Sequence, residues 1–364
     1  MLKILSLSIL VIFVINYKVN SSEIIKPTKT VKNIILLIGD GMGVAQLSTL
    51  FYLNQDESSF RQFKHIGFHQ NQSIDSKITD SAAGATAFSI GFKTYNGAVG
   101  VDADTISRQT ILETAAEMGK STGIISTSSI TDATPASFYA HVKSRRMSES
   151  IAVQLAKSQL DFFAGGGYKD FIHRLDGKNY LEIMKSNGVY IDTISLSKKS
   201  LKHGIRYGFL LAKEEMPKMQ SQRENFLPEA TELAINHLSQ NEKGFFLMVE
   251  GGQIDNGGHE NDADYVIEEM KDFDIAVGVA LDFAKLEKNT LVVVTADHET
   301  GGLALTAAKD LNDESNFKID PTFSTNGHTA CLIPVFSYGP SAEDFTGIYE
   351  NNEIYYRMMR WFTE

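Results

Sequence analysis

The chain has 364 residues, of which 43% are apolar and 22% are charged, and its formal net charge is −11. This composition is ordinary for a globular protein that buries a sizeable core. The acidic balance argues against nucleic acid as a partner, because duplex binding needs clustered basic residues and the notable runs are Lys198-Lys199 and Arg145-Arg146.

The N-terminal residues differ in kind from the rest. Lys3 precedes an apolar run, residues 4–15, that is too short to span a bilayer. The pattern predicts a signal peptide over residues 1–21, cleaved after Ser21, and therefore export to the periplasm or the extracellular space. Loss of Lys3 and Lys18 would take the charge from −11 to −13. Membrane attachment is expected only if the leader stays uncleaved.

An apolar stretch, residues 31–38, leads into Asp40, which lies between two glycines. A strand that is apolar on both faces suits a parallel sheet covered by helices, and such sheets bind ligands at the carboxyl ends of their strands. Two later stretches repeat the pattern: residues 245–249 precede Glu250, Asp255 and His259, and residues 291–295 precede Asp297 and His298. We predict an α/β three-layer sandwich, with a central mostly parallel β-sheet flanked by helices.

The acids and histidines after these strands predict a site for several metal ions. A single acid after a strand is more often a helix cap or a turn former. Several carboxylates gathered at one sheet edge would repel one another and resist ionisation, so bound divalent cations are the simpler explanation.

Two hydroxyl residues precede predicted helices. Ser81 follows Asp80 and precedes small helix formers, so it is either an N-cap or, beside metals, a nucleophile for phosphoryl transfer. Thr134 precedes a proline, so it is either a cap or a ligand of a hard, hydrated cation. Arg145 and Arg146 are interpreted as solvated residues unless a guanidinium there holds phosphate.

Length and spacing assign the remaining elements. No linker or repeat divides the chain, so a single domain is predicted over residues 30–364, with a variable insert at 161–225. The expected elements are helices at 44–53, 109–118 and 228–239, strands at 122–126 and 331–337, a turn at 165–167 and a polar connection at 303–327. A long helix after His259 has core spacing at Val266, Met270, Phe273, Val277, Leu281 and Ala284. Cys331, which has no second cysteine to pair with, is expected to be a small buried strand residue, and His141 is expected to be structural.

Taken in order, these motifs resemble those of the alkaline phosphatases, from about Asn33 to Pro340. The matching segments are Ile-Gly-Asp-Gly-Met-Gly at Asp40, Thr-Asp-Ser-Ala-Ala at Ser81, Asp-Ala-Thr-Pro-Ala at Thr134, Val-Glu-Gly-Gly-Gln-Ile-Asp at Asp255, Thr-Ala-Asp-His-Glu at His298 and Gly-His-Thr at His328. The resemblance implies hydrolysis of small phosphate monoesters to alcohol and phosphate through a phosphoserine. The short 303–327 connection implies the compact bacterial-type form without a crown subdomain.

The resemblance also implies two zinc ions and one magnesium ion. One zinc would bind Asp255, His259 and His328, the other would bind Asp40, Asp297, His298 and the Ser81 oxygen, and magnesium would bind Asp40, Thr134 and Glu250, with Asp132 acting through water. These donor types suit zinc and magnesium respectively. Ser81 would attack phosphorus, Arg145 would hold the phosphate, and Asp80 would orient Arg145.

The residue after Asp255 departs from the family pattern, which often has a charged or ligating side chain there. Asn256 is expected to project near the bound phosphate, to leave Asp132 without a cationic neighbour, and so to weaken product inhibition. The oligomeric state stays open, with a homodimer as one arrangement. The rival functions are a phosphodiesterase or sulfatase of the same superfamily, and a metal- or phosphate-binding protein without turnover.

Overall fold

The computed structural model describes residues 31–54, 57–196, 200–221, 223–308 and 319–362. The predicted signal peptide, residues 1–21, and the Lys198-Lys199 run lie outside these residues. Within the described ranges, no helix has both the length and the apolar character needed to cross a membrane.

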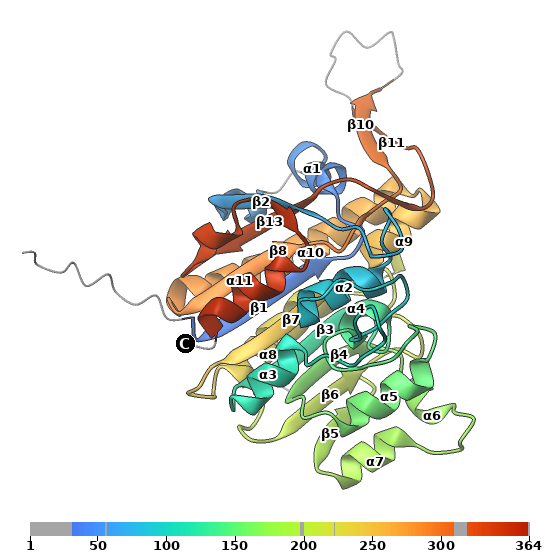
Figure 1. Ribbon diagram of the computed structural model, residues 1–364, viewed down its shortest axis with the longest axis vertical. Coiled ribbons are helices and arrows are strands. Elements are labelled where there is room, and N and C mark those ends of the chain that lie inside the picture. Colours follow the sequence, from blue (N-terminus) through green and yellow to red (C-terminus); the bar gives the residue numbers. More distant parts are fainter. Residues whose placement is uncertain (1–30, 55–56, 197–199, 222, 309–318, 363–364) are drawn as a thin grey trace, which may run out of the picture.

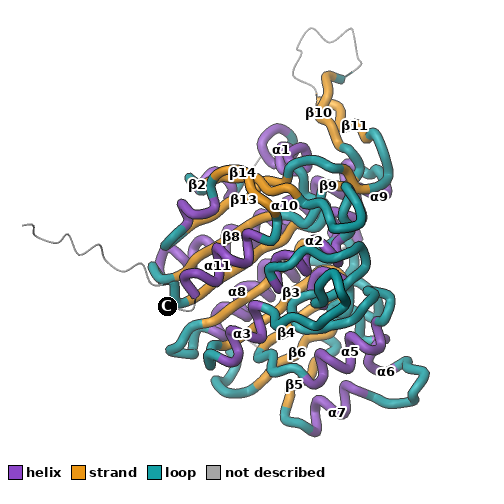
Figure 2. Tube along the Cα trace, viewed as in Figure 1, coloured by secondary structure: helices purple, strands orange, loops and turns teal. Residues whose placement is uncertain are grey.

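A ten-stranded sheet forms the centre of the protein (Figures 1 and 2), in the order β14-β2-β13-β8-β1-β7-β3-β4-β6-β5. Its strands are β1 (Asn33–Gly39), β2 (His65–Gln70), β3 (Ser121–Ser129), β4 (Phe162–Gly166), β5 (Val189–Asp192), β6 (Arg206–Leu210), β7 (Phe245–Gly251), β8 (Thr290–Thr295), β13 (Ile333–Tyr338) and β14 (Gly347–Glu350). The central strand β1 pairs in parallel with β7 and β8. Strand β13 is antiparallel to both of its neighbours, β8 and β2.

The described helices cover the two faces of this sheet. They are α1 (Val44–Tyr52), α2 (Ser81–Ile90), α3 (Ile111–Glu117), α4 (Ala133–Ala136), α5 (Ser148–Lys157), α6 (Lys169–Ile172), α7 (Tyr180–Ser186), α8 (Phe226–Leu238), α9 (Gln253–Glu260), α10 (Ala263–Leu286) and α11 (Glu353–Phe362). Figure 1 shows α2, α3 and α11 in front of the sheet and α8 and α10 behind it. The predicted α/β sandwich with a mostly parallel sheet is confirmed.

Alternation along β1 builds the two cores. Ile34, Leu36 and Ile38 pack in a cluster with residues of α2, α3, α5 and α11, whereas Ile35 and Leu37 pack with residues of α1, α8 and α10. All seven residues of β1 are buried, as a strand covered on both faces requires. The six core residues predicted for the long helix are also buried, on α10.

Several local predictions were wrong. Residues 165 and 166 lie in strand β4 rather than in a turn, because β4 pairs in parallel with both β3 and β6. The stretch 161–225 thus contributes three strands to the central sheet. The expected polar connection contains a hairpin of β10 (Leu303–Ala307) and β11 (Ile319–Phe323). Cys331 is exposed and precedes β13, which begins at Ile333.

Candidate active site

The carboxyl ends of β1, β7 and β8 place the predicted acids and histidines together. Asp40 follows β1 directly, and the next residue, Gly41, has φ of 76°. A Cβ on Gly41 would lie 2.8 Å from the Cα of Asp255 and would be strained at this φ, so glycine permits the close approach. The sheet edge can therefore hold carboxylates from separate strands within contact distance.

His298 lies at the centre of one ligand set. Its Nε2 is 3.3 Å from Asp40 Oδ1, 3.2 Å from Asp297 Oδ2 and 3.2 Å from Ser81 Oγ. The Asp297 and His298 side chains are fully buried. Two strand ends and the first residue of α2 thus converge on one point, as predicted from the sequence.

A second ligand set lies on α9 and β12 (His328–Thr329). Asp255 and His259 are four residues apart, so they share a helix face, and Asp255 Oδ2 is 3.2 Å from His259 Nε2. His328 Nε2 lies 3.2 Å from His259 Nε2 and 3.8 Å from Asp255 Oδ1. The two sets adjoin, because the rings of His298 and His328 stack with centroids 3.5 Å apart.

The other ring nitrogen of each histidine is held by the protein. His259 Nδ1 is 2.7 Å from the Asn326 carbonyl, His328 Nδ1 is 2.8 Å from the Thr79 carbonyl, and His298 Nδ1 is 3.1 Å from Thr300 Oγ1. A carbonyl accepts a hydrogen bond, so it selects the tautomer that leaves Nε2 with a free lone pair. These contacts orient Nε2 of His259 and His328 for a cation.

A third, all-oxygen set surrounds the second oxygen of Asp40. Thr134 Oγ1 donates to Asp40 Oδ2 at 3.4 Å, and Glu250, which is 1% exposed, accepts a hydrogen bond from Ser126. Asp40 therefore lies between this set and the His298 set. Asp40, Thr134 and Glu250 belong to the predicted magnesium set, whereas Ser126 does not, because nothing in the sequence reveals that Ser126 lies opposite Glu250 in the sheet.

Electrostatics favour cations in these sets. Burial, followed by neighbouring carboxylates, raises the pKa of Asp40 well above its usual value, and burial and Asp255 raise that of Asp297 to about 7. Burial and Asp132 are the main influences that raise the pKa of Glu250 to about 8. Asp40 Oδ1 and Asp297 Oδ2 are also buried without a hydrogen-bond partner. Divalent cations would satisfy those atoms and keep the carboxylates ionised, so the residues present fit the implied metals.

Ser81 begins α2 and is 3% exposed. Asp80 is the N-cap, since its side chain accepts from the backbone N–H of Ala83 at 3.0 Å. The interpretation of Ser81 as the N-cap is therefore wrong, and its hydroxyl is free to face His298. At this position the hydroxyl also lies near the positive end of the helix dipole, which stabilises negative charge.

Arg145 is held between two acids. Its guanidinium is 2.9 Å from Asp132 Oδ1 and 3.4 Å from Asp80 Oδ2, and its side chain is 30% exposed. Burial alone would lower the pKa of Arg145, but Asp132 and Asp80 raise it, so the group stays charged. The prediction that Asp132 lacks a cationic neighbour is wrong. Asp132 also caps α4, so Thr134 is not the cap.

Comparisons with known proteins show which family the chain belongs to. The family model for alkaline phosphatase matches residues 31–314. Alkaline phosphatase 3 of Bacillus subtilis is 36% identical, over 89% of this chain and 87% of its own length. The chain belongs to the alkaline phosphatase family.

Solved structures of alkaline phosphatases share the fold. The enzyme from the Antarctic bacterium TAB5 is 51% identical, with a TM-score of 0.89 over 92% of this chain and 99% of that one. The alkaline phosphatase of Escherichia coli K12 is 34% identical over 91% of this chain and 85% of its own length. As an alkaline phosphatase, the chain is a metal-dependent phosphoric monoester hydrolase. One TAB5 variant structure has magnesium bound.

Side chains to which the sequence analysis gave no role surround the candidate site. Thr300 donates to Asp255 as well as lying against His298. Gln46 of α1 donates to Glu299 at 2.7 Å, and Glu299 also accepts from Thr329, beside His328. Thr300 could have been suspected, because it lies two residues after His298 and so shares its side of an extended segment. The partners of Glu299 depend on tertiary contacts.

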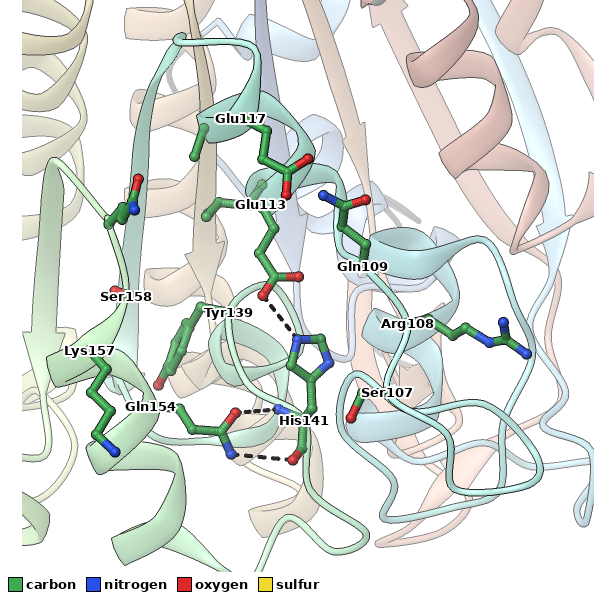
Figure 3. A pocket seen from close by; sticks show the side chains of 13 residues that line it. Ser107, Arg108, Gln109, Glu113, Glu117, Tyr139, His141, Gln154, Lys157 and Ser158 are labelled. Atoms are coloured by element: carbon green, nitrogen blue, oxygen red, sulfur yellow. Dashed lines mark hydrogen bonds and ion pairs between the residues drawn. The ribbon is translucent and has the colours of Figure 1, made fainter.

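A further cavity lies apart from this site. It has a volume of about 670 Å³ and is lined by residues of α3 and α5 and by His141. Figure 3 shows His141 directed at Glu113, with the two side chains 3.0 Å apart. The lining of this cavity includes none of the predicted metal or catalytic residues. The structural interpretation of His141 agrees with these contacts.

Asn256 turns toward the segment that precedes α8. Its side-chain amide donates to Glu215 Oε2 at 2.7 Å. Glu215 belongs to the stretch 161–225, the predicted variable insert. An acid from that stretch therefore lies beside the residue that follows the predicted ligand Asp255.

Proposed function

We propose that the enzyme hydrolyses small phosphate monoesters with Ser81 as nucleophile, through a phosphoserine intermediate. The observation that carries this proposal is the position of Ser81 Oγ, 3.2 Å from His298 Nε2 and at the N-terminus of α2. Such a hydroxyl faces both the ligand set and the positive end of a helix, where a phosphoryl group is stabilised.

We infer two zinc ions and one magnesium ion at the three ligand sets. Asp255, His259 and His328 would hold one zinc, Asp40, Asp297, His298 and Ser81 the other, and Asp40, Thr134 and Glu250 the magnesium, with Asp132 acting through water. When bound, these cations neutralise a phosphate dianion, favour the ionised serine and lower the pKa of water. Nitrogen and carboxylate donors support zinc, and the all-oxygen donors of the third set support magnesium.

The chain's own residues bind and align the substrate. The Arg145 guanidinium offers two parallel N–H groups to phosphate oxygens, and Asp80 and Asp132 hold it beside Ser81. Ser81 Oγ attacks phosphorus in line with the departing alcohol and keeps the phosphoryl group as a monoester. Water then attacks phosphorus from the side that the alcohol left. Each of the two steps inverts the configuration at phosphorus, so the overall reaction retains it.

Replacement of Ser81 tests this proposal. Ser81→Ala is expected to lower kcat for p-nitrophenyl phosphate by about a thousandfold or more, because no hydroxyl remains to accept the phosphoryl group. Metal content and the melting temperature are the accompanying measurements. Ser89→Ala is the matched control, since the Ser89 hydroxyl lies in the same helix and bonds to the Thr86 carbonyl. Acid-stable phosphate labelling in Ser81→Ala equal to that in the parent would overturn the assignment.

A rival activity would give a different substrate profile. A phosphodiesterase or sulfatase would prefer bis-p-nitrophenyl phosphate or p-nitrophenyl sulfate, and a binding protein would turn over none of the three. The grouping of Thr134 and Glu250 with Asp40 supports the monoesterase, and so does the pairing of Arg145 with Asp80, the residue before Ser81. We further propose one catalytic unit over residues 30–364, with 161–225 as its variable part.

We also propose that residues 1–21 direct export and are removed, so that the enzyme acts in the periplasm or outside the cell. A homodimer is proposed as its assembly. Mass spectrometry of the secreted protein tests the cleavage after Ser21, and sedimentation tests the assembly.

A further inference from the structure

A polar cavity of about 460 Å³ adjoins the phosphate-binding arginine. Its charged lining residues are Asp132, Arg145, Lys169, Asp170, Glu214 and Glu215. If Arg145 holds the phosphoryl group, a cavity on this flank can receive part of the alcohol that the phosphate esterifies.

The charges in this cavity are unevenly neutralised. Arg145 pairs with Asp132, and Lys169 pairs with Glu214. Asp170 accepts hydrogen bonds from the hydroxyls of Thr131 and Ser148. Glu215 accepts from Asn256, which is a neutral amide. Four carboxylates against two cations leave the lining negative, and Glu215 is the acid bonded to the residue after Asp255.

The backbone beside Glu215 is anchored to the sheet edge. The next residue, Met216, is buried, and its N–H donates to the Thr127 carbonyl at 3.1 Å. Gln253, at the start of α9, donates to the carbonyls of both Met216 and Thr127. Hydrogen bonds of the Met216 backbone therefore connect this part of the chain to β3 and to α9, the helix that carries Asp255. Partial desolvation of its carboxyl group, followed by the charges of Asp132 and Asp255, raises the pKa of Glu215, and the effect of these charges reflects how close the three acids lie.

We propose that Glu215 is a specificity-determining residue that favours monoesters of cationic or neutral alcohols over monoesters of anionic alcohols. This inference rests on the proposed function, because it requires phosphate at Arg145. An alcohol with an amine would be attracted to the net negative cavity, and an alcohol with a carboxylate would be repelled. Glu215 is exposed, so solvent screens the interaction and the discrimination is modest.

The experiment compares three substrates at pH 9: phosphoethanolamine, 3-phosphoglycerate and p-nitrophenyl phosphate. Glu215→Gln keeps an acceptor for Asn256 while removing the charge. We expect kcat/KM to fall about twofold for phosphoethanolamine and to rise about twofold for 3-phosphoglycerate, with little change for p-nitrophenyl phosphate. Glu215→Lys should lower the ratio of kcat/KM for phosphoethanolamine to kcat/KM for 3-phosphoglycerate further than Glu215→Gln does. High salt should reduce both shifts.

Glu229→Gln is the matched control, because it makes the same change in net charge at an exposed position on α8, outside the cavity lining. An unchanged ratio of the two charged substrates in both Glu215 variants would overturn the inference. So would an equal shift in the control. A parent enzyme that does not hydrolyse p-nitrophenyl phosphate would instead refute the proposed function, so the two failures are distinguishable.

Discussion

At the scale of single residues, Arg145 and the adjacent Arg146 have different surroundings. Arg145 is held by two carboxylates, whereas Arg146 is exposed. Arg145→Ala should therefore raise the inhibition constant for phosphate by about tenfold to a hundredfold, the usual effect of losing a charge-assisted double hydrogen bond. Arg146→Ala should change it less than twofold. Competitive inhibition by phosphate measures both, and equal effects would contradict the assignment of Arg145.

Asn256 is the second position where a single side chain matters. A lysine there would lie beside Glu215 and would pair with that carboxylate before it reached phosphate. We expect Asn256→Lys alone to tighten phosphate inhibition by less than about threefold, and Asn256→Lys with Glu215→Gln to tighten it by about tenfold. The double variant should also lower kcat, since product release slows. Asn256→Gln, which stays neutral, is the control. Equal tightening in the single and double variants would show that Glu215 does not restrain the lysine.

At the scale of elements, the ion pair of Glu113 and His141 anchors α3. Thr110 and Glu113 form a capping box at the start of this helix, and Glu113 also contacts His141. Burial alone would lower the pKa of His141, but the hydrogen bond with Glu113 raises it. A raised folded-state pKa adds stability below the unfolded-state value of about 6.5, and this stability is lost as pH rises through the folded-state value.

His141→Gln should therefore cost more stability at pH 6 than at pH 9. The Glu113 side chain is 37% exposed, so we expect a loss of only about 0.5–1 kcal/mol at pH 6. Urea unfolding at the two pH values measures the difference. The exposed His173 supplies the control variant His173→Gln, which makes the same substitution outside this ion pair. A larger loss for His141→Gln at pH 9 would contradict the interpretation.

At the scale of the whole molecule, metal removal should destabilise the fold. Without cations, the raised pKa values of Asp297, about 7, and Glu250, about 8, mean that these buried carboxylates resist ionisation. A carboxyl group with a raised pKa stabilises the folded state fully at a pH below its unfolded-state pKa, which is near 4. This stabilisation is lost as pH rises through the folded-state pKa values of about 7 and about 8. The metal-free protein should therefore weaken from pH 5 to pH 9.

Calorimetry with and without chelator tests this prediction. We expect chelation to lower the melting temperature by about 5–10 °C at pH 9 and by less at pH 5.5. Restored magnesium and zinc should reverse the loss. An unchanged melting temperature after verified removal of metal would contradict it.

The residues that follow strands could be predicted from the sequence, because a strand's apolar run and its end are local properties. Asp40, Asp297 and His298 lie where that pattern placed them, at neighbouring carboxyl ends of parallel strands. Asp255 and His259 share a helix face because they are four residues apart in the sequence. The helix α10 and its core positions were likewise readable from periodicity.

Tertiary structure decided what no local pattern encodes. The sheet order sets Ser126 opposite Glu250 and lets Gly165 and Gly166 enter a strand, because pairing partners there are distant in sequence. Arg145 lies between Asp80 and Asp132 because the fold brings these three residues together, which residue type alone does not determine. Long-range contacts likewise brought Glu215 to Asn256, over a separation of 41 residues. The ligand types were therefore fixed by sequence, whereas the charges that surround the substrate depend on how the chain folds.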